Sequence, residues 1–131
     1  MVLALDLTFD NVHLYCSDLD ATERWFTTFL GAELLRHRIN RTAPATDLQL
    51  GGITIFLRGE QEGEALAKPG PKRFGTDHIG FRVRDLAATT LELKRRGVEF
   101  DSEPHQNRPG LRVAFIRGPD AVRIELLQYD E

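Results

Sequence analysis

Residues 77–86 of this chain read DHIGFRVRDL, and residues 11–19 read NVHLYCSDL. In each stretch apolar and polar side chains alternate, and an Asp-Leu pair follows. Alternation with a period of two predicts a strand with one buried face. An aspartate just before an apolar pattern of helical spacing predicts the start of a helix. The chain therefore predicts the same strand-to-helix opening twice, with buried faces formed by Val12, Leu14 and Cys16 and by Ile79, Phe81 and Val83.

The elements after each opening are also alike. Helical spacing predicts a first helix that ends at Gly31 and a second, over residues 85–96, that ends at Gly97, because glycine readily adopts the left-handed conformation of a helix C-terminus. Three strands are predicted after each helix. They lie near residues 33–39, 46–50 and 53–58 in the first half and near residues 98–101, 111–117 and 122–128 in the second. The order βαβββ thus occurs twice.

The length limits how these halves can fold. A chain of 131 residues is long enough for one core and too short for two independent ones. We expect a single α+β domain over residues 1–131, in which two tandem βαβββ modules, about 8–58 and 76–131, form one curved mixed sheet around a cavity. Residues 59–75 are rich in Gly, Pro, Glu and Lys without a period and predict a linker. Core or rim packing is predicted for the aromatic residues Trp25, Phe26 and Phe74.

Composition excludes several classes of protein. A hydrophobic share of 41% beside 28% charged residues is typical of a soluble globular protein. No run approaches the roughly 20 apolar residues of a membrane span, and the first ten residues lack the features of a secretory signal, so we expect a cytoplasmic protein. The single cysteine, Cys16, excludes an intrachain disulfide. A net charge of −3 shows no excess that would bind a nucleic-acid backbone.

Polar residues on otherwise buried strands are the candidates for chemistry. His78 and Glu125 face away from the apolar sides of their strands, and His13 shares the polar face of the first strand. If both sheets form one surface, these side chains converge, and imidazole with carboxylate suits a divalent metal. A set of two histidines and one carboxylate leaves coordination positions open for a substrate with two adjacent oxygens. The alternative for Glu125 is an ion pair with Arg112 or Arg123.

These motifs resemble those of the vicinal oxygen chelate superfamily, which includes glyoxalase I, bleomycin resistance proteins and extradiol dioxygenases. The resemblance rests on the two openings and on the closing residues 118–126, and it covers essentially the whole chain. It implies a divalent metal (Zn, Ni, Mn, Co or Fe) held by residues of the first and last strands of the modules. His78 and Glu125 match the two ligand positions of the second module.

The first module departs from that family pattern. The first ligand usually stands seven residues before the Asp-Leu pair, where this chain has Asn11, while His13 lies two residues later. Either residue is a candidate for the first-module ligand. A further ligand position falls on Phe56, which cannot bind metal. Phe115 occupies the place of a tyrosine that the ring-cleaving dioxygenases of the family carry.

The resemblance implies a glyoxalase-like, metal-dependent lyase or isomerase that acts on a small oxygenated metabolite through an enolate-type intermediate. Glu125 would be both a metal ligand, with His13 and His78, and the group that moves a proton. The alternatives are a metal-free ligand-sequestering protein of the bleomycin-resistance type and a ring-cleaving dioxygenase. Family members of this length commonly form homodimers, so we expect one here. Candidate pocket residues are Asn11, Tyr15, Phe56, Arg58, Arg82 and Phe115.

Overall fold

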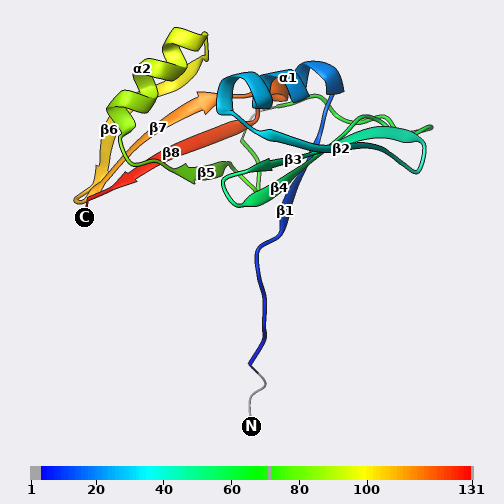
Figure 1. Ribbon diagram of the computed structural model, residues 1–131, viewed down its shortest axis with the longest axis horizontal. Helices are drawn as coiled ribbons and strands as arrows, with labels where there is room; N and C mark the ends of the chain where they lie inside the picture. Colours follow the sequence, from blue (N-terminus) through cyan, green and yellow to red (C-terminus); the bar gives the residue numbers. More distant parts are fainter. Residues whose placement is uncertain (1–3, 71, 131) are drawn as a thin grey trace. The chain divides into compact units, whose positions relative to one another are not determined.

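The structure, a computed structural model, describes residues 4–70 and 72–130 (Figure 1). Its backbone contacts divide the chain into two compact units, with the boundary between Glu64 and Ala65. Each unit holds one helix and a four-stranded mixed sheet of its own. The predicted α+β class and the repeated βαβββ order are confirmed.

The first unit contains β1 (Asn11–Tyr15), α1 (Leu19–Leu30), β2 (Glu33–Asn40), β3 (Ala43–Leu50) and β4 (Ile53–Arg58). Its strands lie in the order β1-β4-β3-β2. β1 pairs with β4 in parallel, and the other neighbours are antiparallel. α1 packs on one face of the sheet, against β3 and β4, and leaves the opposite face uncovered by any helix of its unit (Figure 1).

The second unit repeats this arrangement with β5 (Ile79–Arg82), α2 (Leu86–Arg96), β6 (Phe100–Arg108), β7 (Leu111–Arg117) and β8 (Arg123–Tyr129). The strand order is β5-β8-β7-β6, and β5 pairs with β8 in parallel. A short 3-10 turn, η1 (Pro119–Ala121), joins β7 to β8. In both units, therefore, the first strand lies beside the last one.

The helix ends explain why the two halves fold alike. The Asp18 carboxylate accepts a hydrogen bond from the Ala21 backbone N–H at 3.0 Å, and the Asp85 carboxylate accepts one from Ala88 at 2.9 Å. These bonds satisfy backbone donors that have no partner inside a helix. Gly31 and Gly97 end the helices with φ of 72° and 97°, which a side chain would strain.

Each sheet buries the apolar side that the alternation predicted. In the first unit Phe26 of α1 is fully buried with Leu48, Ile55 and Leu57 of the sheet. In the second unit Leu86 and Leu93 of α2 are buried, as are residues of β7 and β8, among them Val113, Ala114, Ile116, Ile124 and Leu126. Asn11 and His13 of β1 and Glu125 of β8 are left on the other face.

Two strands are longer than predicted. β3 starts at Ala43, earlier than predicted, because Pro44 interrupts the alternation on which the prediction rested. The Pro44 carbonyl nevertheless accepts a hydrogen bond from the Gly59 N–H at 3.2 Å. β6 continues to Arg108 through Pro104, and its pairing with β7 has three register irregularities. β6 lies at the edge of its sheet, and an edge strand tolerates proline and irregular register because only one side needs partners.

The first part of the predicted linker, residues 59–64, is hydrogen-bonded to the first unit. Gln61 and Glu64 are bound to the first unit, since the Gln61 amide donates to the Asn40 carbonyl at 2.7 Å and Glu64 pairs with Arg58. The core or rim position predicted for Phe74 is wrong, because that side chain is fully exposed. Trp25 is partly buried and packs edge-on against Phe26. Among the residues described, no helix has the length and apolar character needed to cross a membrane.

The buried ring of Phe26 gives a test of the first core. We expect Phe26→Ala to lower the free energy of unfolding by about 3–5 kcal/mol, because it removes a large fully buried side chain and leaves a cavity. The matched control is Leu91→Ala in α2, since Leu91 is 72% exposed and its loss should cost less than about 0.5 kcal/mol. Chemical denaturation measures both, and equal effects would contradict the assigned core.

Candidate functional site

His78 and Glu125 lie together on the polar face of the second unit. Glu125 of β8 is opposite Gly80 of β5, and His78 stands two residues before Gly80, on the same face. His78 Nε2 is 3.3 Å from Glu125 Oε1. The Glu125 side chain is 13% exposed and that of His78 is 32% exposed, so both remain open to a small ligand.

Gly80 makes this approach possible. A Cβ atom at Gly80 would lie 3.0 Å from Leu127 Cδ1 and 3.5 Å from Glu125 Oε1. A side chain there would occupy the space between His78 and Glu125, because residues two apart on a strand share a face. The glycine therefore lets the Glu125 carboxylate reach the imidazole.

A second carboxylate holds the other side of the His78 ring. His78 Nδ1 lies 2.8 Å from Asp77 Oδ2, and Arg123 of β8 donates a hydrogen bond to the same oxygen. The hydrogen bond with His78, and then the positive charge of Arg123, lower the pKa of Asp77. The predicted alternative, an ion pair of Glu125 with Arg123 or Arg112, is wrong: Arg123 pairs with Asp77 instead.

Phe115 packs beside this group. Its ring meets His78 edge-on, with centroids 5.2 Å apart and planes at 87°, and the Arg123 guanidinium lies 4.3 Å from its centroid. Phe115 is opposite Glu125 in the pairing of β7 with β8. The predicted pocket residue thus adjoins both candidate ligands and offers only an apolar ring.

The His78–Glu125 pair fits two positions of a divalent metal centre. Two donor atoms that each lie about 2.1 Å from one ion, at tetrahedral or octahedral angles, are roughly 3.0–3.4 Å apart. The 3.3 Å between Nε2 and Oε1 falls in that range. Within residues 4–70 and 72–130, however, the structure forms no group of three or more His, Cys, Asp or Glu side chains that could hold a metal ion.

The corresponding positions of the first unit carry different chemistry. His13 is opposite Phe56 in the parallel pairing of β1 with β4, as Gly80 is opposite Glu125 in the second unit. Phe56 therefore occupies the position of Glu125, and Asn11 that of His78. Asn11 donates a hydrogen bond to Asp10 at 2.7 Å. The register thus gives Phe56 the position in the first unit that Glu125 has in the second.

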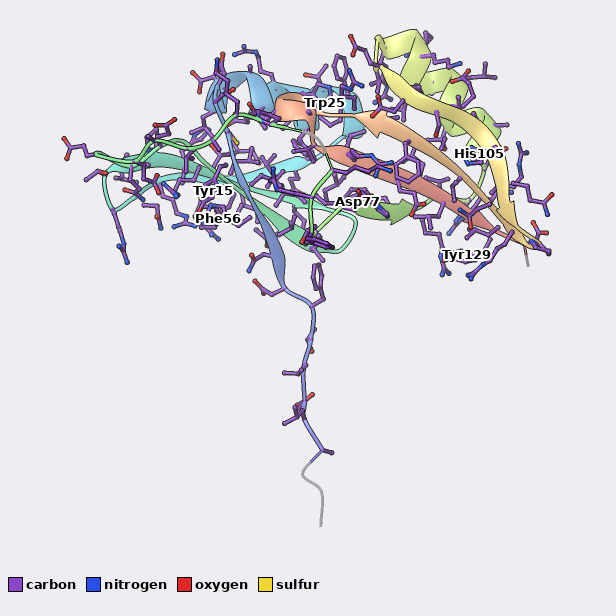
Figure 2. All side chains as sticks on the ribbon, turned by 180° about the vertical axis from the view of Figure 1, so that it is seen from behind. Tyr15, Trp25, Phe56, Asp77, His105 and Tyr129 are labelled. Carbon is purple, nitrogen blue, oxygen red and sulfur yellow. The ribbon has the colours of Figure 1, made fainter. Side chains whose placement is uncertain are left out.

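His13 lies among aromatic rings and arginines. Its ring is 4.2 Å from that of Phe56 and 5.0 Å from that of Tyr15, and Figure 2 labels both neighbours on this sheet. The Arg38 guanidinium lies 4.1 Å from the Phe56 centroid, and that of Arg58 lies 4.6 Å from the Tyr15 centroid. Burial, followed by the charges of Arg58 and Arg38, lowers the pKa of His13. The lowered pKa favours the neutral imidazole, which is the form that binds a metal, but the nearby cations oppose a metal ion.

Carboxylates fix the two arginines of this face. Arg58, only 5% exposed, forms a two-pronged ion pair with Glu64 at 2.7 and 3.1 Å. These bonds lower the pKa of Glu64 to about 2 and raise that of Arg58. Arg38 donates to the buried Asp47 carboxylate at 3.1–3.3 Å. Guanidinium groups held this way form a rigid wall beside Tyr15 and Phe56.

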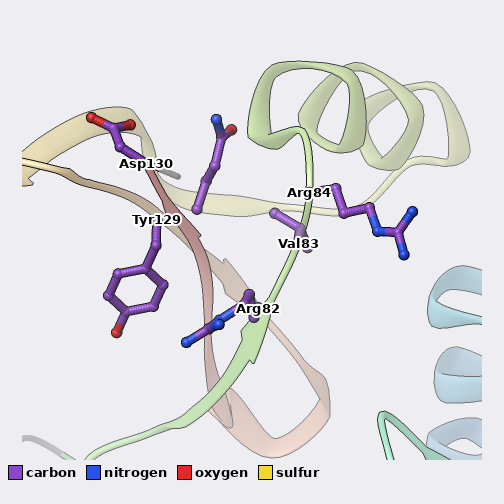
Figure 3. Close-up of a pocket in the computed structure, with 6 residues that line it drawn as sticks. Arg82, Val83, Arg84, Tyr129 and Asp130 are labelled. Carbon is purple, nitrogen blue, oxygen red and sulfur yellow. The ribbon is translucent and has the colours of Figure 1, made fainter.

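Arg82, another predicted pocket residue, lies elsewhere in the second unit. Its guanidinium is 4.5 Å from the Tyr129 ring centroid. Both side chains line an open hollow of about 1150 Å³ formed by Arg82, Val83, Arg84, Gln128, Tyr129 and Asp130 (Figure 3). Gln128 is committed to the fold, because its amide oxygen accepts the Leu86 N–H at the start of α2. The hollow contains neither His78 nor Glu125, and an open polar depression of this kind is weaker evidence of a site than the convergent pair.

Sequence reasoning missed three residues of these two faces, Asp77, Arg38 and Glu64, and considered Arg123 only as an ion-pair partner of Glu125. A signal existed for Arg123, since it stands two residues before Glu125 and shares its face. Asp77 directly precedes His78, and an adjacent carboxylate is a common partner of a functional imidazole. Glu64 had no such signal, because its contact with Arg58 depends on the path of the chain after β4.

Comparison with known proteins agrees with this architecture. A family model described as the glyoxalase/bleomycin resistance protein/dioxygenase superfamily matches residues 8–126. A probable lactoylglutathione lyase of Synechocystis is 29% identical over 122 residues, covering 85% of this chain and 87% of that protein. One of Vibrio cholerae is 32% identical over 122 residues, covering 88% and 86%. A glyoxalase/bleomycin resistance protein/dioxygenase domain from Frankia superimposes with a TM-score of 0.79 at 26% identity, covering 98% of this chain and 95% of that one.

The Arg58–Glu64 pair predicts how stability depends on pH. The carboxylate is stabilised in the folded protein, so its contribution is complete above its ordinary pKa of 4.5 and is lost as the pH falls towards about 2. Glu64→Gln should lower the thermal midpoint at pH 7 and reduce its fall between pH 5 and 2. Glu62→Gln is the control, because Glu62 is exposed and makes no ion pair within the described part of the chain. Identical acid profiles for wild type and Glu64→Gln would contradict the assignment.

Proposed function

Because this chain belongs to the glyoxalase/bleomycin resistance protein/dioxygenase superfamily, we propose that it is a metal-dependent lyase or isomerase acting on a small oxygenated metabolite. Two relatives of similar length, at 29% and 32% identity, are described as probable lactoylglutathione lyases. The substrate of this chain belongs to the same broad chemistry, a carbonyl with an oxygen on the neighbouring carbon. The ion is Zn, Ni, Mn, Co or Fe.

One observation carries the proposal: His78 Nε2 and Glu125 Oε1 converge at 3.3 Å on an open sheet face. Glu125 lies within β8, and His78 directly precedes β5, so the backbone pairing of β5 with β8 brings the two donors together. Such rigid placement is what a metal centre needs. When bound, a divalent ion supplies Lewis-acid stabilisation of the charge that develops on a carbonyl oxygen.

In this proposal Glu125 is the base. Its carboxylate takes a proton from the carbon beside the carbonyl and returns it to the neighbouring carbon, while His78 remains in place. No second carboxylate serves in the first module, because Phe56 stands at the equivalent position. A single base that first accepts and then donates the proton is sufficient for isomerisation.

A second candidate function has its own support in the first unit. The rings of His13, Tyr15 and Phe56 and the guanidiniums of Arg38 and Arg58 form a continuous series of ring–ring and cation–π contacts. A planar or electron-rich ligand could stack there without metal, as in a sequestering protein of the bleomycin-resistance type. The ring-cleaving alternative has less support, because Phe115 beside His78 lacks a hydroxyl group.

We further propose that the protein is a cytoplasmic homodimer.

Metal content separates the first two functions. Protein purified without an affinity tag should hold about one equivalent of a divalent metal, measured by mass spectrometry. His78→Ala and Glu125→Ala should each lower the affinity by at least tenfold, because each removes a ligand. His105→Ala is the control, since His105 is an exposed residue of β6 that bonds only to the Glu103 carbonyl in the described structure. No metal, even after loading, would favour the sequestering protein.

The role of the first module is tested by replacing its two candidates separately. Metal loss in His13→Ala but not in Asn11→Ala would identify the histidine as a ligand, and the reverse result would identify the amide. Retention of metal in both variants would contradict any ligand from β1. Titration calorimetry with the metal found in the native protein measures all three cases.

Turnover tests the proposed base. With an enolisable carbonyl substrate that the protein converts, Glu125→Gln should reduce kcat by about 10²–10⁴-fold, the usual contribution of a positioned base. The glutamine keeps the size of the side chain but cannot accept the proton. Normal kcat in a variant that still binds metal would rule out Glu125 as the base.

A further inference from the structure

Asp77, His78, Arg123 and Phe115 form a closed ring of contacts in the second unit. Asp77 Oδ2 lies 2.8 Å from His78 Nδ1, and Arg123 donates to the same oxygen. Arg123 in turn lies 4.3 Å from the Phe115 centroid, and Phe115 meets the His78 ring edge-on at 5.2 Å. Each member therefore contacts two others.

The two nitrogens of the His78 imidazole have separate partners. Nδ1 is directed to Asp77 and Nε2 to Glu125. A neutral imidazole carries only one N–H, and the contact with Asp77 is the shorter of the two, at 2.8 Å against 3.3 Å. We therefore place the hydrogen of the neutral ring on Nδ1 and its lone pair on Nε2, facing Glu125. This tautomer is the one in which Nε2 is able to bind a ligand on the side of Glu125.

We propose that Asp77, held by Arg123, is a positioning residue that sets the tautomer and the ring orientation of His78. This role deepens the proposed function and rests on it only for the consequence, the affinity for metal. The tautomer itself is a property of the metal-free chain. Carboxylates that accept from the second nitrogen of a metal-bound histidine commonly change metal affinity by 10–100-fold.

Arg123 is needed because Asp77 is half exposed, at 48% of its side-chain area. A carboxylate so close to water would otherwise rotate among several hydrogen-bond partners. The guanidinium binds Asp77 on one side and packs over Phe115 on the other, so its own position is restricted. Replacing Arg123 by methionine keeps much of the apolar part of the side chain and removes the guanidinium that binds Asp77.

The tautomer can be read directly by nitrogen NMR of the metal-free protein, with histidine labelled by ¹⁵N and the His78 signals assigned by their loss in His78→Gln. At a pH where the ring is neutral, the hydrogen of the wild-type ring should reside on Nδ1. Asp77→Ala should lower the ratio of the Nδ1–H to the Nε2–H form by about tenfold or more, the effect of losing a charge-assisted hydrogen bond. Arg123→Met should lower it in the same direction by a smaller factor.

The matched control is Asp101→Ala, which removes an aspartate–arginine pair of the same unit, Asp101 with Arg117 at 2.6 Å, that does not contact His78. It should leave the ratio unchanged. An unchanged ratio in Asp77→Ala, or an equal change in Asp101→Ala, would overturn the proposal. If Asp77→Ala does not fold, judged by circular dichroism, Arg123→Met decides the question by the same ratio.

Titration with the metal found in the native protein gives the second readout. Asp77→Ala should weaken binding by 10–100-fold while Asp101→Ala stays within twofold of wild type. A wild type that binds no metal would refute the proposed function, whereas the tautomer ratio would still decide whether Asp77 positions His78. An intact tautomer effect with unchanged affinity would overturn the positioning role in metal binding.

Discussion

The parallel pairing of the first and last strands is the constraint on which both units depend. In the second unit it places Gly80 of β5 opposite Glu125 of β8, so that His78, two residues earlier, reaches the carboxylate across the missing side chain. Residues 47 positions apart in the sequence thereby become neighbours with backbone hydrogen bonds to hold them. A shift of one residue in this register would turn Glu125 towards α2 and into the core.

The same scaffold supports different chemistry in the first unit. Asn11, His13 and Phe56 take the positions of His78, Gly80 and Glu125. A ring at the glycine position fills the space that a carboxylate would need, and it packs on Phe56 instead. The two modules therefore differ at strand positions that face away from their helices, where a different side chain changes the core little.

The ion pairs of the two units also have different roles. In the first unit Arg58 and Arg38 are paired with Glu64 and Asp47, so the guanidiniums act as fixed walls for the aromatic rings. In the second unit the Arg123–Asp77 ion pair contacts a single imidazole, that of His78. The pairing of β5 with β8 brings the His78 and Glu125 donor atoms close together. The Arg123–Asp77 ion pair orients the His78 ring.

The sequence by itself determined the α+β class, the repeated βαβββ order, both helix ends and the faces of β1 and β8, because these depend on local periodicity and capping. It also singled out His78 and Glu125 as polar residues on buried strands. The tertiary structure decided the ion pairs: Arg123 pairs with Asp77 rather than with Glu125, and Glu64 pairs with Arg58. It also extended β6 beyond Asp101 and exposed Phe74. The extent of an edge strand, the Arg58–Glu64 pair and the exposure of Phe74 depend on which segments meet in space, and a local pattern does not encode that.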